Sequence, residues 1–193
     1  MEIIKRYEKF KSYKTAFAIF LTTVTLSSIA MALLYKKEPS LSAVGDLAMA
    51  VGCDMRASVF LEICFLLFVF TAGPTIYAPV GSFLATALYG ALFGVRCLCA
   101  DSPFSLGVEI FFSCITAYGL VIYSSFVTLT SLRIFSATKI NGKRELFDGV
   151  MFRADKFIGI FNLRYVLSYV AFFILFALFI SFFSATKVFL LSL

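Results

Sequence analysis

Histidine and tryptophan are absent from the sequence, and charged residues make up only 15% of it. Without histidine, the chain lacks the usual general base near neutral pH and the commonest nitrogen ligand of zinc. The charged share is also well below the value of about 25% that is typical of water-soluble domains. We therefore expect no catalytic residues, no metal site and no cofactor.

Apolar side chains are correspondingly abundant. Hydrophobic residues account for 61% of the chain, 25 residues are phenylalanine, and the mean hydropathy is +0.97. Lipid is the simplest surrounding for such an excess. The net charge of +6 would suit nucleic acid, but the basic residues flank apolar runs, as they do when they orient a protein in a bilayer. The sequence predicts a lipid bilayer as partner and no nucleic acid.

The apolar runs predict an all-α, polytopic membrane protein of about five transmembrane helices, forming a single integral membrane domain over residues 1–193. One helix of about 20 residues crosses the hydrocarbon core. The run 57–100 is long enough for two spans, so we interpret it as a central helical hairpin that turns at 77–81, where Pro79 and Gly81 interrupt it. The expected spans are 15–35, 57–76, 81–100, 106–135 and 165–185.

Short amphipathic segments are expected at the membrane surface between these spans. Residues 137–164 place apolar and charged side chains on different faces, which is typical of a cytoplasmic surface helix. Residues 38–56 indicate a loop with a small interfacial helix. The basic residues 1–14 form either an interfacial helix or a solvated tail that fixes orientation, and the sequence leaves both open.

Basic residues also predict the orientation. With the N-terminus in the cytoplasm, the tail, the 77–81 turn and the 133–164 loop together hold twelve Lys and Arg residues, whereas the outer pieces hold five. Positive charge collects on the cytoplasmic side of membrane proteins. We therefore expect a multi-pass protein of the cell membrane with a cytoplasmic N-terminus and an extracytoplasmic C-terminus.

Glu62 and Glu109 are the acidic residues placed inside apolar runs, each one or two turns from the outer end of its helix. A carboxylate there is costly unless it is paired, hydrated or protonated, so both are candidate functional residues. They fit a cation or proton relay, or a polar contact with a partner helix. The structural alternative is a pair with Arg56 or Arg96, which are expected on the same side, or extension of the side chain to the interface.

Glycine and proline positions predict how the hairpin is shaped. Gly73-Pro74 should kink the second span, because proline removes a backbone hydrogen bond. Broken helices bind substrate in some transporters, while the structural interpretation is closure of the hairpin. In the third span, small residues recur every fourth position from Ser82 to Gly94, with Gly90 between them. This stripe allows close packing, either within the protein or with a partner helix.

The order of these elements resembles the stage II sporulation protein M family of bacterial membrane proteins. The resemblance rests on the basic N-terminus, the outer loop, the hairpin segment TAGPTIYAPVGSFLATALYGALFG and the basic segment before the last span. Gly73, Pro74, Gly90 and Gly94 are the positions that match. The resemblance implies a non-enzymatic membrane scaffold that positions peptidoglycan-degrading partners in a spore-forming bacterium.

The sequence therefore favours a scaffold or assembly subunit that binds membrane-protein partners or forms a homo-oligomer. A small transporter or permease subunit is the alternative, supported by Glu62, Glu109 and the broken second helix. A membrane-embedded enzyme ranks last, because the chain has no histidine and no clustered acids.

The hairpin provides the first testable prediction. A cysteine introduced near Pro79, in a variant without the native cysteines, should react with a membrane-impermeant thiol reagent from the cytoplasmic side, because two spans return the chain to the side on which it started. Labelling of right-side-out and inside-out vesicles measures this. Labelling from the outside alone would show that the predicted topology is wrong.

Overall fold

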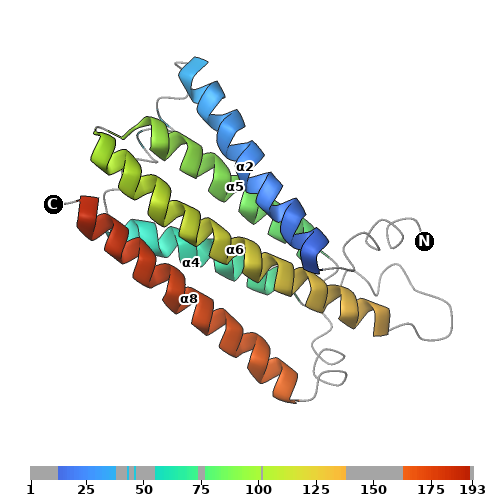
Figure 1. The fold of residues 1–193 in the computed structure, drawn as a ribbon. Helices are drawn as coiled ribbons and strands as arrows, with labels where there is room; N and C mark the ends of the chain where they lie inside the picture. The colour runs from blue at the N-terminus through green and yellow to red at the C-terminus, as the bar shows by residue number, and fades with distance from the viewer. Residues whose placement is uncertain are drawn as a thin grey trace.

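The computed structural model describes residues 13–37, 55–73, 77–100, 102–137 and 163–191, together with the single positions 43 and 46. Its long elements in these ranges are five α-helices (Figure 1): α2 (Tyr13–Lys37), α4 (Met55–Ala72), α5 (Ala78–Leu98), α6 (Pro103–Ala137) and α8 (Leu163–Leu191). The expected all-α class is confirmed. Within the described ranges, α2, α5, α6 and α8 are long and apolar enough to cross a membrane, and α4 contributes the shorter apolar stretch Val59–Ala72.

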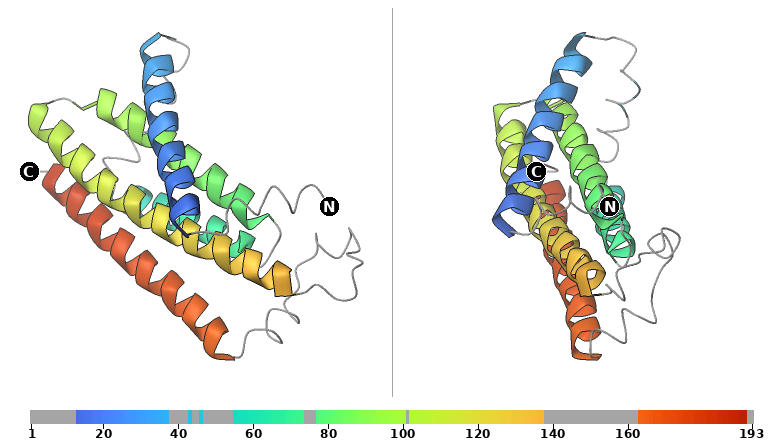
Figure 2. Two further views of the ribbon diagram at one scale, coloured as in Figure 1. Left: turned by 45° about the vertical axis from the view of Figure 1, so that its right-hand side comes forward. Right: turned by 90° about the vertical axis from the view of Figure 1, so that its right-hand side faces the viewer.

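The described helices alternate in direction, so that α2, α5 and α8 run one way and α4 and α6 the other (Figure 1, Figure 2). α5, α6 and α8 lie side by side with α4, while α2 packs across α5 and α6. The alternation brings the beginnings of α4 and α6 beside the ends of α5 and α8. This end of the bundle holds the candidate site.

The turn of the α4–α5 hairpin lies earlier than the sequence predicts. α4 ends at Ala72 and α5 begins at Ala78, so the expected turn at 77–81 is wrong, because residues 78–81 are helical. Residues 74–76, the expected end of the second span, lie outside the described residues. Pro79 lies in the first turn of α5. The first backbone N–H groups of a helix have no partner within it, so proline is favoured there. Here proline begins a helix instead of interrupting one.

Gly73 lies directly after α4 and ends this helix, so the kink expected within the second span is also wrong. The N–H of Gly73 donates to the carbonyl oxygens of Val69 and Phe70, each at 3.1 Å. The Tyr169 hydroxyl of α8 donates to the same Phe70 oxygen at 2.9 Å. A Cβ atom at Gly73 would overlap that hydroxyl, so glycine leaves the room for Tyr169 to cap α4. Pro74 lies outside the described residues.

Gly90 and Gly94 pack against α2 of the same chain, so this part of the small-residue stripe contacts a helix within the protein. A Cβ atom at Gly90 would overlap the Ser27 hydroxyl and the Val24 carbonyl oxygen, and one at Gly94 would overlap the carbonyl oxygen of Ser28. The two backbones approach this closely because neither glycine carries a side chain. These glycines therefore serve packing within the protein.

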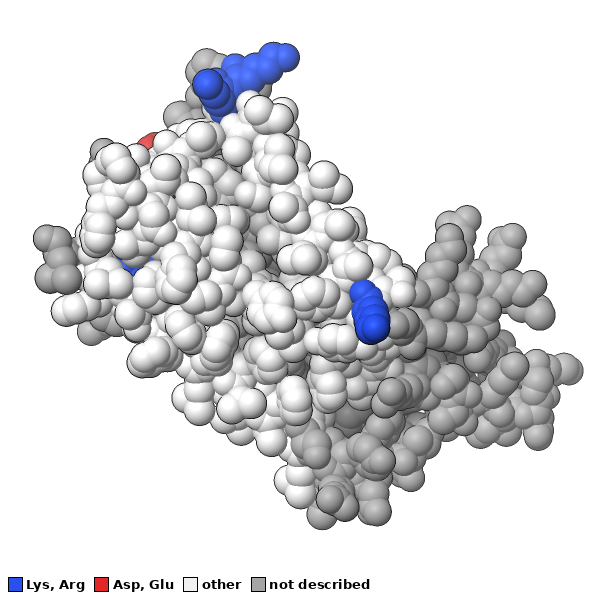
Figure 3. Space-filling model, viewed as in Figure 1, with Lys and Arg blue, Asp and Glu red and all other residues white. Residues whose placement is uncertain are grey.

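Large apolar side chains cover the outside of the bundle. Some are at least 65% exposed, namely Leu26, Leu33, Phe60, Phe104, Leu178 and Phe182. Figure 3 shows a face almost without charge, on which the largest basic areas lie at the two ends of α2 and only small blue and red areas appear elsewhere. Such a surface fits a multi-pass membrane protein, because lipid covers apolar side chains without the cost that water imposes.

Several expected features fall outside the described residues. The interfacial segments within 1–14, 38–56 and 137–164 lie almost wholly there, so they stay predictions. The number of membrane crossings also stays a prediction. α4 has 18 residues and is therefore about 27 Å long at 1.5 Å per residue, which is close to the lower limit for a span.

The α2–α5 contact yields a prediction with a matched control. Gly94→Ala should lower the unfolding free energy in detergent by roughly 1–3 kcal/mol, because its Cβ meets the rigid backbone of α2. Gly107→Ala in α6 places a Cβ in open space and should be neutral or slightly stabilising, since alanine favours helix. Thermal unfolding of both variants measures the difference. Equal effects would mean that α2 does not pack on Gly94.

Candidate functional site

Four ionisable side chains lie together inside the bundle, at the end where α4 and α6 begin and α5 and α8 end. Glu62 comes from α4, Arg96 from α5, Glu109 from α6 and Lys187 from α8. Each residue is at most 5% exposed. We refer to these residues as the charge cluster. Its two acids and two bases balance when all four are ionised.

The direction of the helices favours this placement of charge. A helix carries partial positive charge at its N-terminus and partial negative charge at its C-terminus. The two acids lie in the first half of α4 and α6, and the two bases lie near the ends of α5 and α8. The effect is strongest for Arg96, which lies in the last turn of α5, because the field of the dipole falls off within about one turn.

Glu109 is the centre of the charge cluster. Its Oε1 atom accepts a hydrogen bond from Lys187 Nζ at 3.4 Å and lies 3.9 Å from Arg96 Nη1. The Ser113 hydroxyl, one turn further along α6, donates to the same oxygen at 2.9 Å. Glu109 thus connects α5, α6 and α8 through one carboxylate oxygen.

A layer of hydroxyl groups continues from the charge cluster toward the middle of the bundle. The buried Tyr89 of α5 donates its hydroxyl hydrogen toward the carbonyl oxygen of Ser113 at 3.3 Å, and it shares a hydrogen bond with the Thr116 hydroxyl. These contacts bring hydrogen-bonding groups of α5 and α6 together within an apolar interior, where unpaired polar groups are costly.

Glu62 and Arg96 keep unused hydrogen-bonding capacity. Neither carboxyl oxygen of Glu62 has a hydrogen bond of normal geometry with a described residue, and the same holds for Nε and Nη2 of Arg96. Glu62 nevertheless interacts electrostatically with Lys187, Arg96 and Glu109. The charge cluster therefore contains one acid in direct contact with both bases and one acid that meets the Ser184 hydroxyl of α8 and interacts with the bases at longer range.

The structure brings together three of the four charged residues that the sequence singles out. Glu62, Glu109 and Arg96 all belong to the charge cluster. Arg56 lies in the first turn of α4, but its side chain is outside the described residues.

Sequence reasoning missed Lys187. The predicted fifth span stops at 185, whereas α8 continues to Leu191 and encloses Lys187, which is 1% exposed. A signal was present, because the apolar residues Val188 to Leu191 follow this lysine. A lone lysine inside an apolar helix needs an acidic partner, and Glu109 is that partner.

Groups suited to hold a metal ion are not found in the described ranges, where no three His, Cys, Asp or Glu side chains gather. The thiol of Cys99 instead donates to the Tyr35 hydroxyl at 3.7 Å. This contact connects the ends of α5 and α2 near the charge cluster.

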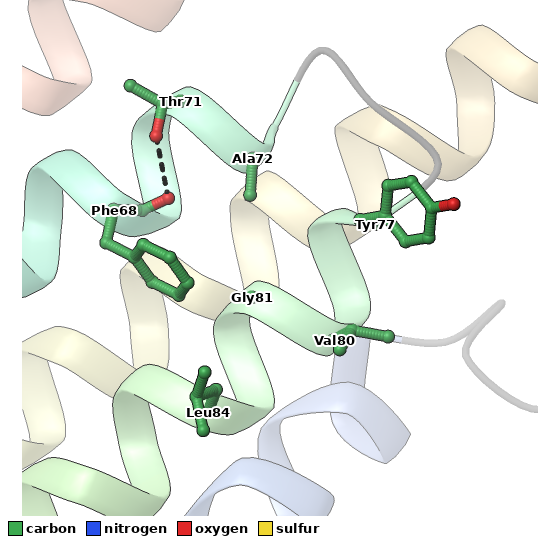
Figure 4. A pocket seen from close by; sticks show the side chains of 7 residues that line it. All are labelled: Phe68, Thr71, Ala72, Tyr77, Val80, Gly81 and Leu84. Carbon is green, nitrogen blue, oxygen red and sulfur yellow. Dashed lines mark hydrogen bonds between the residues drawn. The ribbon is translucent and has the colours of Figure 1, made fainter. Parts of the chain in front are cut away.

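A separate apolar groove of about 340 Å³ lies at the other end of the α4–α5 hairpin. Figure 4 shows the Phe68 ring of α4 and the Leu84 side chain of α5 turned toward each other beside Gly81. The Thr71 hydroxyl already donates to the Phe68 carbonyl oxygen at 3.1 Å. The groove therefore offers mainly apolar contact, of the kind that a lipid chain also makes.

Comparisons with protein-family models, with curated proteins and with solved structures give no match for this chain.

A double-mutant cycle tests the central contact of the charge cluster. Glu109→Gln should lower the unfolding free energy by about 3–5 kcal/mol, because it leaves buried cations without their carboxylate. Lys187→Met should cost less, since Arg96 remains beside Glu109. The double variant should cost less than the sum of the two.

Denaturant unfolding in detergent supplies these free energies. Lys36→Met, at the exposed end of α2, is the matched control and should change little. Strict additivity of Glu109→Gln and Lys187→Met would contradict a direct interaction between the two side chains.

Proposed function

We propose that this protein is a non-enzymatic integral membrane scaffold or assembly subunit, which binds and positions partner proteins. In this proposal it lies in the cell membrane with its N-terminus in the cytoplasm and its C-terminus outside. The partners are membrane-associated proteins, and cell-wall remodelling factors of a spore-forming bacterium are the class that the resemblance in layout suggests.

The observation that carries this proposal is the pairing within the charge cluster. Glu109, a first candidate for a relay, is bound by Lys187, Arg96 and Ser113. A carboxylate held by three groups from three helices has a sufficient structural role: it fixes how those helices pack. This supports a rigid frame over a pathway for ions.

The exposure of α2 supports partner binding. Only 11% of its most apolar window is buried inside the protein, compared with 61% for α6. In its second half, α2 presents Leu26, Ile29 and Leu33 on its outer side, with exposures of 68%, 55% and 65%. Helices in membranes associate through packing of such faces, and this face lies at the edge of the bundle.

Alternating helix directions fit five crossings, and the excess of basic residues indicates which end of the bundle faces the cytoplasm. If all five described helices cross the membrane, the charge cluster lies near the outer surface, and Gly73 and Tyr77 lie near the cytoplasmic surface. That arrangement matches the excess of basic residues in the segments assigned to the cytoplasm.

Affinity purification of the full chain in mild detergent, followed by mass spectrometry, tests the scaffold. We expect co-purifying membrane-associated proteins, with cell-wall hydrolases among them. Leu26→Ala combined with Leu33→Ala should reduce their recovery about tenfold, equivalent to about 1.4 kcal/mol. Leu175→Ala with Leu178→Ala, at equally exposed leucines of α8, is the control and should leave recovery unchanged.

The alternative, a small transporter or permease subunit, has one observation in its favour. Glu62 is a buried carboxyl whose oxygens make no hydrogen bond of normal geometry with a described residue and interact only with the Ser184 hydroxyl and with charges at longer range, as expected for a group that exchanges an ion or a proton. Recovery of an ATPase in the same purification would support this function. Purification of the bare monomer would contradict both partner-dependent proposals.

A further inference from the structure

Glu62 occupies an unusual position within the charge cluster. It is 2% exposed, and neither of its carboxyl oxygens has a hydrogen bond of normal geometry with a described residue. Charged groups of three other helices act on it: Arg96 of α5, Lys187 of α8 and Glu109 of α6. Tyr89 of α5 also interacts with it electrostatically.

The two bases that should neutralise Glu62 are engaged elsewhere. Lys187 Nζ and Arg96 Nη1 lie 3.4 and 3.9 Å from the same Oε1 atom of Glu109. Besides these bases, only the Ser184 hydroxyl of α8 interacts favourably with Glu62, and an ionised carboxylate without a cation in direct contact costs several kcal/mol in a low-dielectric interior. A neutral carboxyl in the same place costs only about 1–3 kcal/mol. The arrangement therefore favours a neutral Glu62.

Arg96 provides the means of stabilising the ionised form. Its Nε and Nη2 atoms, along one edge of the guanidinium group, have no hydrogen-bond partner among the described residues. An arginine can bind two carboxylates at once, because its donors form a planar fork. Arg96 can thus keep Glu109 through Nη1 and offer its other edge to Glu62.

We propose that Glu62 is a reversible proton-binding site whose protonation state sets the contacts of Arg96. With the proton on the Glu62 carboxyl, Arg96 contacts Glu109 alone and the charge cluster carries one net positive charge. When the proton leaves to water, the ionised Glu62 accepts hydrogen bonds from the free edge of Arg96, and the cluster becomes neutral. The exchange couples α4 to α5, since these helices supply the two side chains.

The coupling gives the site a consequence for the whole bundle. In the protonated state, α4 has no ion pair with the rest of the charge cluster among the described residues, and its end is held by Tyr169. In the ionised state, a charge-assisted bond joins the beginning of α4 to α5, and such bonds are about twice as strong as neutral ones. Proton release therefore tightens the hairpin.

Infrared spectroscopy of the full chain in phosphatidylcholine vesicles tests the proposal. At mildly alkaline pH, carboxyls in contact with water are ionised, so a remaining carboxylic-acid C=O band reports a buried protonated group. We expect this band in the wild type and in Glu38→Gln, the control for a carboxyl outside the predicted spans, and its loss in Glu62→Gln. Absence of the band in the wild type, or its persistence in Glu62→Gln, would overturn the proposal.

A second variant tests the role of Arg96. This test does not depend on whether Glu62→Gln folds. Arg96→Gln removes the cation that stabilises the ionised Glu62, so the pH at which the band disappears should rise by at least about one unit. Lys36→Met, which removes an exposed cation of α2, should leave this pH unchanged. An unchanged midpoint in Arg96→Gln would overturn the coupling between Glu62 and Arg96.

Discussion

Burying an ionised group in an apolar bundle costs several kcal/mol unless opposite charge and hydrogen bonds surround it. Glu109 meets that condition by accepting contacts from Lys187, Arg96 and Ser113 on one oxygen. This requirement constrains the placement of whole helices as well as the Glu109 side chain. It requires α5 and α8 to end where α6 begins, and it sets the rotation of each helix about its axis. Because the helices alternate in direction, the buried acids and bases come from neighbouring helices and lie close together.

Aromatic packing holds the opposite end of the bundle. Phe70 of α4 lies against Tyr169 and Phe173 of α8, with ring centroids 4.9 and 4.8 Å apart. Phe126 of α6 stacks on Phe172 at 4.6 Å. The Tyr169 hydroxyl, by capping α4 at Phe70, adds a polar contact to this apolar end. α4 and α8 are thus joined at one end by aromatic rings and meet at the other near charged groups, which is where a change of protonation can alter how α4 is held.

α5 is the central helix because small residues on two of its faces admit close neighbours. Toward α6, the Ser82 hydroxyl donates to the Ser124 carbonyl oxygen at 3.4 Å and accepts from Thr128 at 3.2 Å. Toward α2, Gly90 and Gly94 allow backbone contact. Hydroxyl and glycine contacts replace the hydrophobic driving force, which is weak between helices in lipid. Since these contacts lie inside the protein, the outer face of α2 stays available to the proposed partner.

The sequence by itself determined the all-α class, the long apolar helices and three members of the charge cluster, because length, hydropathy and isolated charges are local properties. It misplaced the hairpin turn, since proline both begins and breaks helices and only the position of Ala72 and Ala78 distinguishes these roles. Only the tertiary structure decided that Gly73 makes room for Tyr169 and that Lys187 pairs with Glu109. These contacts join residues far apart in the chain, whose meeting depends on the direction and rotation of whole helices.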